Sequence, residues 1–192
     1  ILLSSIILLL VVQPDLGQSV LLTCVWLSLI FVSGINIFYL FFILIFAVLI
    51  FFSLLYIAPE KFSYIVTRLT SFMDPTKPGN FQSQKATEAI KQGGLKGQGM
   101  GEGVLKESVP EAHTDYIIAV VSEEFGSIVS ILIIAIFLFV AFRIIKKIVN
   151  FSNNFYKLSL SGLASLLVFQ AFIHVGVNAN LLPTTGMTLP FL

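Results

Sequence analysis

Charged residues are scarce in this sequence, and cysteine is nearly absent. Only 11% of the 192 residues are charged, with 11 Lys and Arg against 10 Asp and Glu, and the one cysteine is Cys24. Soluble domains carry roughly 25% charged residues. The composition therefore excludes an ordinary water-soluble domain, a disordered chain and a nucleic-acid-binding protein that depends on a basic surface. A lone cysteine also excludes a disulfide within the chain. The 57% of hydrophobic residues, with 19 Phe, indicate a membrane protein.

Long stretches without charge predict the membrane spans. No charged residue lies between Leu16 and Pro59, which leaves room for two spans of about 20 residues, and Gly34 and Asn36 separate them. Pro14 ends an earlier apolar run. The predicted spans are residues 1–12 (the end of a span), 17–33, 37–57, 116–142 and 158–177.

The predicted fold class is all-α: a polytopic integral membrane helical bundle in which residues 1–192 form a single membrane domain. The chain begins at Ile1 inside an apolar run and shows no signal peptide. We therefore expect it to be a piece of a larger membrane protein.

Most of the charge is gathered in one segment. Fourteen of the 21 charged residues, seven acidic and seven basic, lie between Glu60 and Asp115. This predicts a large aqueous loop over residues 58–115, too long to be a mere connection. Within it we expect an interfacial helix at 61–72, a short helix at 87–91 and an irregular glycine-rich stretch at 93–103.

The remaining basic residues predict the orientation of the chain. Arg143, Lys146, Lys147 and Lys157 occur without any acidic residue, which marks a cytoplasmic loop at 143–157 by the positive-inside rule. Counting spans from that loop places three segments together on the extracytoplasmic face: residues 13–17, the loop 58–115 and the irregular segment 178–192. We therefore expect the chemistry of the protein on this outer face.

Asp15 and a glycine-rich run are the first candidate functional features. Asp15 is the only charged residue before Glu60, so it is either a functional carboxylate or the N-cap of the following helix, and both readings are compatible. Residues 97–103 resemble a phosphate-binding loop, but no Gly-Lys-Ser/Thr follows, so tight turns are the better interpretation. The basic residues around this run, which remain able to meet an anion, are Lys91, Lys96 and Lys106.

Residues 111–115 form the densest cluster of titratable groups. Asp115 is interpreted either as the N-cap of the next helix, with Glu123 and Glu124 in its early turns, or as a general base whose pKa is tuned by desolvation. The cluster has no second His and no Cys, so it does not predict a metal site. We expect His174, within a span, to form a hydrogen bond between helices.

Six short motifs, taken together and in order, resemble one family. They are residues 13–17 (Q-P-D-L-G), 70–75 (T-S-F-M-D-P), 97–101 (G-Q-G-M-G), 110–116 (P-E-A-H-T-D-Y), 122–126 (S-E-E-F-G) and 182–186 (L-P-T-T-G). The chain resembles the SEDS family (shape, elongation, division, sporulation) over essentially its whole length, with the motif pattern of the cell-division members. The resemblance implies about ten spans in the full protein, of which four complete spans and one partial span fall here.

The resemblance also implies a function. It predicts a peptidoglycan glycosyltransferase that polymerises lipid II during septal cell-wall synthesis, with inversion at the donor sugar and undecaprenyl pyrophosphate as the leaving group. The family's catalytic carboxylate falls on Asp115. The candidate substrate-binding residues are Asp15, Arg68, Gln82, Lys96, Gln98, Lys106, Glu111, His113, Thr114, Pro183, Thr184 and Thr185.

Cofactors, partners and location follow from the same resemblance. A divalent cation, Mg²⁺ or Mn²⁺, is a possible cofactor with no assigned ligands. The expected partners are lipid II, membrane lipid, a class B penicillin-binding protein that supplies the transpeptidase, and other division proteins, but no nucleic acid. The expected location is the bacterial cytoplasmic membrane, with the active face outside. The alternatives are a lipid II flippase and a non-enzymatic scaffold of the division machinery.

Overall fold

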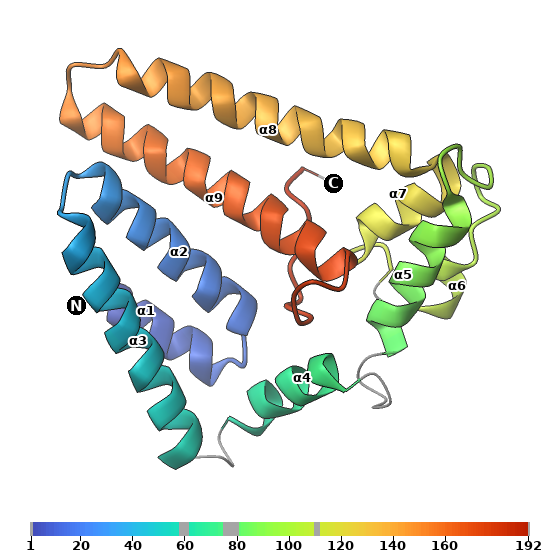
Figure 1. Cartoon of the computed structure of the whole chain (residues 1–192), viewed down its shortest axis with the longest axis horizontal. Helices are drawn as coiled ribbons and strands as arrows, with labels where there is room; N and C mark the ends of the chain where they lie inside the picture. Colours follow the sequence, from blue (N-terminus) through green and yellow to red (C-terminus); the bar gives the residue numbers. More distant parts are fainter. Residues whose placement is uncertain (1, 58–61, 75–80, 110–111, 192) are drawn as a thin grey trace.

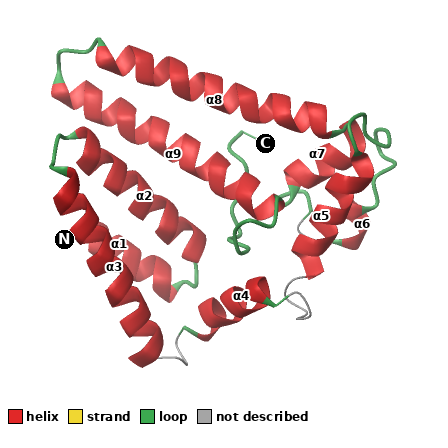
Figure 2. Ribbon diagram, viewed as in Figure 1, coloured by secondary structure: helices red, strands yellow, loops and turns green. Residues whose placement is uncertain are grey.

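The computed structural model describes residues 2–57, 62–74, 81–109 and 112–191, and within these ranges every regular element is an α-helix (Figure 2). This confirms the predicted all-α fold class. The helices are α1 (Leu2–Val12), α2 (Leu16–Val32), α3 (Ile37–Ile57), α4 (Ser63–Met73), α5 (Phe81–Gly93), α6 (Leu105–Ser108), α7 (Ile117–Phe125), α8 (Ser127–Val149) and α9 (Asn154–Asn178).

The longest helices pack side by side. α2 lies against α9, and α9 lies against α8 (Figure 1). Among the described residues, α8 and α9 are long and apolar enough to cross a membrane, while α2 and the first part of α3, Ile37–Ser53, are shorter apolar helices. The outward faces of these helices carry many exposed large hydrophobic side chains, as a surface in contact with lipid would.

Local signals set several helix ends, and those of α2 and α3 lie where the sequence predicts them. α2 and α3 begin and end within one residue of the expected ranges 17–33 and 37–57. Asp15 caps α2, because its Oδ1 accepts the backbone N–H of Gln18 at 3.0 Å. Gly34 directly follows Ser33, the C-cap of α2, and its φ of +87° suits the turn that ends this helix. The Asn153 side chain caps α9 by accepting the N–H of Phe155 at 2.9 Å.

The expected single span over residues 116–142 is wrong: this stretch contains two helices. α7 ends at Phe125 and α8 begins at Ser127, and Gly126 between them has φ at +89° and ψ at 163°. Only glycine adopts this conformation readily. Across the bend, the hydroxyls of Ser122 and Ser130 lie 2.7 Å apart.

The predicted cytoplasmic loop at 143–157 is also too long. α8 continues to Val149, so Arg143, Lys146 and Lys147 belong to its last turns, and only residues 150–153 connect it to α9. Positive charge does not end a helix. Cations near a helix C-terminus interact favourably with the helix macrodipole, and the aliphatic parts of their side chains extend along the apolar surface. Lys157 likewise lies inside α9, which begins before the expected residue 158.

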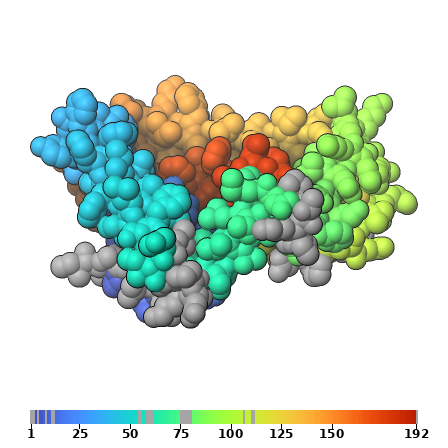
Figure 3. Space-filling view, turned by 60° about the horizontal axis from the view of Figure 1, so that its bottom comes forward, coloured from blue at the N-terminus to red at the C-terminus, as the bar shows by residue number. Residues whose placement is uncertain are grey.

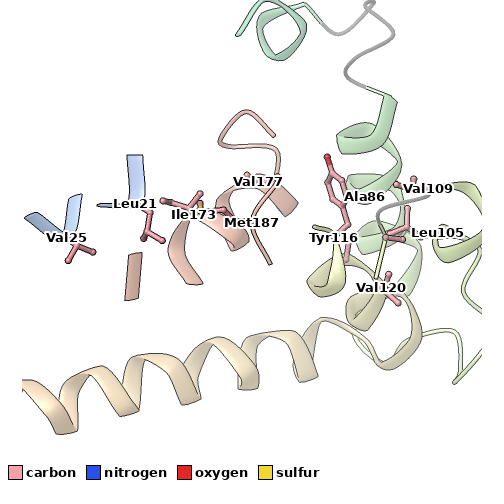
Figure 4. Close-up of a cluster of buried hydrophobic side chains, with 13 residues drawn as sticks. Leu21, Val25, Ala86, Leu105, Val109, Tyr116, Val120, Ile173, Val177 and Met187 are labelled. Carbon is pink, nitrogen blue, oxygen red and sulfur yellow. The ribbon is translucent and has the colours of Figure 1, made fainter. Parts of the chain in front are cut away.

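The buried core joins the membrane helices to the large loop. One part of it lies on α2, α9 and the C-terminal segment, and the other lies on or next to α5, α6 and α7 (Figure 4). The labelled side chains of the first part are Leu21, Val25, Ile173, Val177 and Met187, and those of the second are Ala86, Leu105, Val109, Tyr116 and Val120. The loop is thus a folded helical layer with its own packing, and the expected helices at 61–72 and 87–91 correspond to α4 and part of α5.

Residues 179–191 are irregular, as predicted, and fold back along α9. Gln170 Nε2 donates to the carbonyl of Thr188 at 3.0 Å. His174 is fully buried, and its Nδ1 lies 2.9 Å from the carbonyl oxygen of Met187. The expectation that His174 joins two helices is therefore wrong, since the residue holds the C-terminal segment instead.

Candidate functional site

The beginning of α2 lies directly against the C-terminal segment. A Cβ atom on the buried Gly17 would lie 2.6 Å from the carbonyl oxygen of Thr185, which is closer than real Cβ contacts. Only glycine permits this approach at the first turn of α2. Asp15, two residues earlier, therefore sits at the end of the bundle where Thr184 and Thr185 pass.

Helix α4 covers the same segment from another side. Arg68 Nη1 donates to the carbonyl oxygen of Thr184 at 3.3 Å. Figure 3 shows α4 in front, with the red C-terminal part of the chain visible between α3 and α5. The contact brings Arg68 to the segment that Gly17 touches, so the interfacial helix expected at 61–72 contributes a cation to the site.

The electrostatics of Tyr64 place Asp15 and Arg68 in one neighbourhood. Burial raises the pKa of the Tyr64 phenol, the Arg68 guanidinium lowers it, and the Asp15 carboxylate raises it. Tyr64 and Arg68 are four residues apart on α4 and so share a face. The influence of both side chains on the Tyr64 pKa fits a position of Asp15 and Arg68 near the same phenol.

Asp115 borders the same segment. It is half-buried and lies two residues before the first residue of α7. A Cβ atom on Gly186, whose φ is +71°, would lie 3.9 Å from Asp115 Oδ2. Residues 184–186 thus connect Arg68 and the first turn of α2 to Asp115. The structure brings together Asp15, Arg68, Thr184, Thr185 and Asp115, which are five of the residues singled out from the sequence.

The N-cap reading of Asp115 is wrong. The N-cap of α7 is Tyr116, and Tyr116 makes no side-chain cap bond. A residue from another helix serves the first turn: Asn178 Oδ1 accepts the backbone N–H of Ala119 at 3.0 Å. Sequence reasoning missed Asn178, because nothing local distinguishes an asparagine at a helix end that caps its own helix from one that caps another.

The glycine-rich stretch at 93–103, which we call the clasp, has a structural role. The N–H groups of Gln98 and Gly99 donate to the carbonyls of Glu123 and Glu124 at 2.8 and 3.0 Å. A Cβ atom on Gly97 would overlap the carbonyl of Glu124. These contacts confirm the tight-turn interpretation of the run. They also fix it at the end of α7 opposite to Asp115, about 12 Å away along a helix of nine residues.

Glu123 does not lie where the sequence predicts it. We expected it in the early turns of a helix that Asp115 caps, but it lies near the end of α7 and is 1% exposed. Its Oε1 and Oε2 accept the N–H groups of Val104 and Leu105 at 3.0 and 3.1 Å. A carboxylate in a predicted span signals a special role, and here that role is to anchor the start of α6.

The other candidate residues occupy several places. Lys96 and Gln98 are exposed on the clasp, and Gln82 is half-buried on α5. His113 and Thr114 are exposed in the turn before Asp115, and Pro183 is half-buried in the C-terminal segment. Glu111 lies outside the described residues, as does the side chain of Lys106, whose backbone belongs to α6. Their roles in binding stay predictions.

The described residues give no direct support for a protein-bound metal. No group of three His, Cys, Asp or Glu side chains gathers among them. Asp15 and Asp115, which both lie near residues 184–186, are carboxylates of the kind that Mg²⁺ or Mn²⁺ binds together with substrate phosphates. A divalent cation therefore stays a prediction.

Curated relatives cover the chain almost completely. A probable peptidoglycan glycosyltransferase FtsW from Caulobacter vibrioides is 37% identical over 184 residues, which are 96% of this chain and 46% of that protein. The protein of the same name from Francisella salina is 37% identical over 198 residues, covering 100% of this chain and 48% of that protein. The chain thus spans about half the length of the curated relatives it matches.

A solved structure shares the fold. Its description is "Structural coordination of polymerization and crosslinking by a peptidoglycan synthase complex", and one of its chains matches 96% of this chain with a TM-score of 0.74 and 23% identity. The match covers 51% of that chain. The family model described as "Cell cycle protein", for FtsW, RodA and SpoVE, matches residues 1–192. The chain therefore belongs to the FtsW/RodA/SpoVE family of membrane proteins, the SEDS family that its motifs predicted.

Proposed function

We propose that the protein containing this chain is a peptidoglycan glycosyltransferase that polymerises lipid II into glycan strands at the division septum. The names of its curated relatives support this activity. The observation that carries the proposal is the juxtaposition of Asp115, Arg68 and Asp15 around residues 184–186 at one end of the bundle. A carboxylate base and a cation at one membrane surface suit a transfer from a lipid pyrophosphate.

Asp115 is the proposed general base. The 4-hydroxyl of the acceptor GlcNAc gives its proton to the Asp115 carboxylate as its oxygen attacks the anomeric carbon of the donor MurNAc. The bond from that carbon to the pyrophosphate oxygen breaks, and undecaprenyl pyrophosphate leaves with the electron pair. The α-linked donor becomes a β-linked product in one inverting displacement. One base suffices, because a pyrophosphate leaves without the acid that a sugar alcohol requires.

Arg68 is the proposed partner of the leaving group. A guanidinium has five N–H donors in a planar fork that suits phosphate, and the bond to the Thr184 carbonyl uses one of them. That bond also fixes the side chain beside residues 184–186. A divalent cation held by Asp15 would neutralise further charge on the pyrophosphate.

The proposed location is the bacterial cytoplasmic membrane, with Asp115 on its extracytoplasmic face. The basic last turn of α8, which contains Lys146 and Lys147, supports this orientation. A class B penicillin-binding protein is the proposed partner, and the similar solved structure, described as coordinating polymerization and crosslinking, supports it. The exposed apolar faces of the membrane helices offer surfaces for such docking as well as for lipid.

The test is lipid II polymerisation by the purified full-length protein and its Asp115→Asn variant. We expect the variant to lose about 10²–10⁴-fold in rate, the usual contribution of a general base. The matched control is Glu102→Gln, which neutralises an exposed carboxylate of the same loop and should polymerise at the wild-type rate. Wild-type glycan yield from a folded Asp115→Asn variant would remove Asp115 from the mechanism.

A vesicle assay with labelled lipid II separates the proposed enzyme from its alternatives. If the wild-type protein moves lipid II across the bilayer but makes no glycan, the flippase reading replaces the proposal. If neither activity occurs and Asp115→Asn still supports division, the scaffold reading replaces it. Glycan synthesis that depends on Asp115 supports the polymerase.

A further inference from the structure

Both polar atoms of the Asn178 side chain, at the end of α9, form hydrogen bonds. Asn178 is 1% exposed. Its Nδ2 donates to the carbonyl oxygen of Asp115 at 2.9 Å and to that of His174 at 2.8 Å, and its Oδ1 accepts the N–H of Ala119 at 3.0 Å. Two of these three bonds cross from α9 to the backbone around the start of α7.

The two bonds from α9 to the start of α7 hold the backbone at Asp115 and at Ala119. One holds the carbonyl of Asp115 itself, and the other holds an N–H one turn later, so the first turn of α7 is fixed to α9 at both ends. An amide offers a donor and an acceptor on one rigid plane, whereas a carboxylate offers only acceptors and an aliphatic side chain offers neither. Asparagine is therefore specifically suited to this position.

The same face of α9 also holds the other wall of the site. His174 and Asn178 lie four residues apart and so share one face of the helix. His174 binds the carbonyl of Met187, just after Gly186, which lies beside the Asp115 carboxylate. One helix face thus sets both the backbone of Asp115 and the segment opposite its carboxylate.

We propose that Asn178 is a positioning residue for Asp115: its amide fixes the backbone of Asp115 at the distance from residues 184–186 that the transfer requires. This proposal rests on the proposed polymerase function. A misplacement of about 1 Å can reduce a rate about 10²-fold. Loss of the amide should therefore lower kcat for glycan synthesis and leave the KM for lipid II nearly unchanged, because the Asn178 side chain is buried.

The experiment compares Asn178→Asp and Asn178→Leu in the full-length protein with Gln170→Leu as the matched control. Asn178→Asp keeps an acceptor for Ala119 but loses the donor to Asp115, whereas Asn178→Leu keeps only the approximate shape. Gln170→Leu removes a hydrogen bond of the same helix without touching α7. Lipid II is the substrate, and kcat and KM are measured separately.

Hydrogen exchange gives a readout that does not depend on activity. Peptides that contain the N–H of Ala119 should exchange faster in Asn178→Leu and at the wild-type rate in Gln170→Leu. We expect kcat to fall about 10²-fold in both Asn178 variants, with KM changed less than about twofold, and to fall less in the control.

Each other outcome has a defined meaning. If Asn178→Asp folds and keeps the wild-type kcat, or if KM rises while kcat holds, the positioning role is wrong. A loss of kcat in Gln170→Leu equal to that in the Asn178 variants would show general structural damage and overturn the proposal too. If the wild-type protein makes no glycan, both proposals are wrong, even if hydrogen exchange at Ala119 still shows that Asn178 binds the start of α7.

Discussion

Glu123 illustrates how one buried carboxylate decides the course of a loop. A charged group is stable in the interior only when it is paired or hydrogen-bonded, and both oxygens of Glu123 accept backbone N–H groups at the start of α6. Gly103 is part of the same arrangement, since a Cβ there would lie 2.7 Å from Glu123 Oε2. The clasp and α6 are therefore organised around this side chain.

We predict that Glu123→Gln destabilises the protein by about 1.5–3 kcal/mol, the usual range for a hydrogen bond to a charged group. The amide keeps one acceptor but turns its NH₂ toward a second backbone N–H. Thermal unfolding followed by the fluorescence of Trp26, the one tryptophan in the chain, measures the loss. Glu102→Gln, at an exposed position of the same loop, should leave Tm unchanged. Equal Tm values for the two variants would contradict the anchoring role.

At the scale of elements, the clasp depends on the approach of two backbones. Gly97 has φ at +80° and lies against the carbonyl of Glu124, whereas Gly94 has φ at +54° with no atom within 4 Å of its Cβ position. The two glycines thus share a left-handed conformation but differ in the space around them. Substituting each glycine in turn therefore distinguishes the cost of backbone strain from the cost of close contact within a single loop.

We predict that Gly94→Ala costs about 1–2 kcal/mol from strain alone, and that Gly97→Ala costs a further 1–3 kcal/mol or so because the loop must move away from α7. Amide exchange at Gln98 and Gly99, whose N–H groups bind the end of α7, should accelerate only in Gly97→Ala. If both variants behave alike, the close approach does not hold the loop.

At the scale of the whole molecule, orientation rests on the separation of charge. The folded loop with the clasp lies at the beginning of α8, and the basic residues lie at its end (Figure 1). If α8 crosses the bilayer, these two regions face opposite compartments. Met100 is 78% exposed on the clasp, and Ser152 is exposed in the connection after α8, so each can report one side.

We predict that Met100→Cys reacts with a membrane-impermeant maleimide in intact spheroplasts, whereas Ser152→Cys reacts only after lysis. Both are made in the full-length protein with every native cysteine, Cys24 included, replaced by alanine, and that background alone should stay unlabelled. The reverse labelling pattern would overturn the orientation inferred from the positive-inside rule. It would place Asp115 in the cytoplasm, where the proposed polymerisation does not occur.

Local features of the sequence determined the helices and much of the site. Long uncharged stretches specify helices because the backbone in an apolar environment must satisfy its own hydrogen bonds, and α2 and α3 match the predicted ranges closely. Asp15 capped its helix as the N-cap reading predicts, because that bond spans three residues. The motifs identified the family and singled out Asp115 without reference to any contact.

Only the tertiary structure decided which groups meet. Asn178 lies 63 residues from Asp115 in the sequence, and Glu123 lies 19 residues from Val104, so no periodicity or spacing indicates either bond. The break at Gly126 was missed because apolar runs lie on both sides of the polar stretch at 122–127, and only the backbone angles show that the helix ends there. The sequence by itself thus determined the membrane class, the family and the candidate base. The packing of α9 against α7 and the C-terminal segment decided how that base is held, because buried polar groups find partners wherever folding brings them.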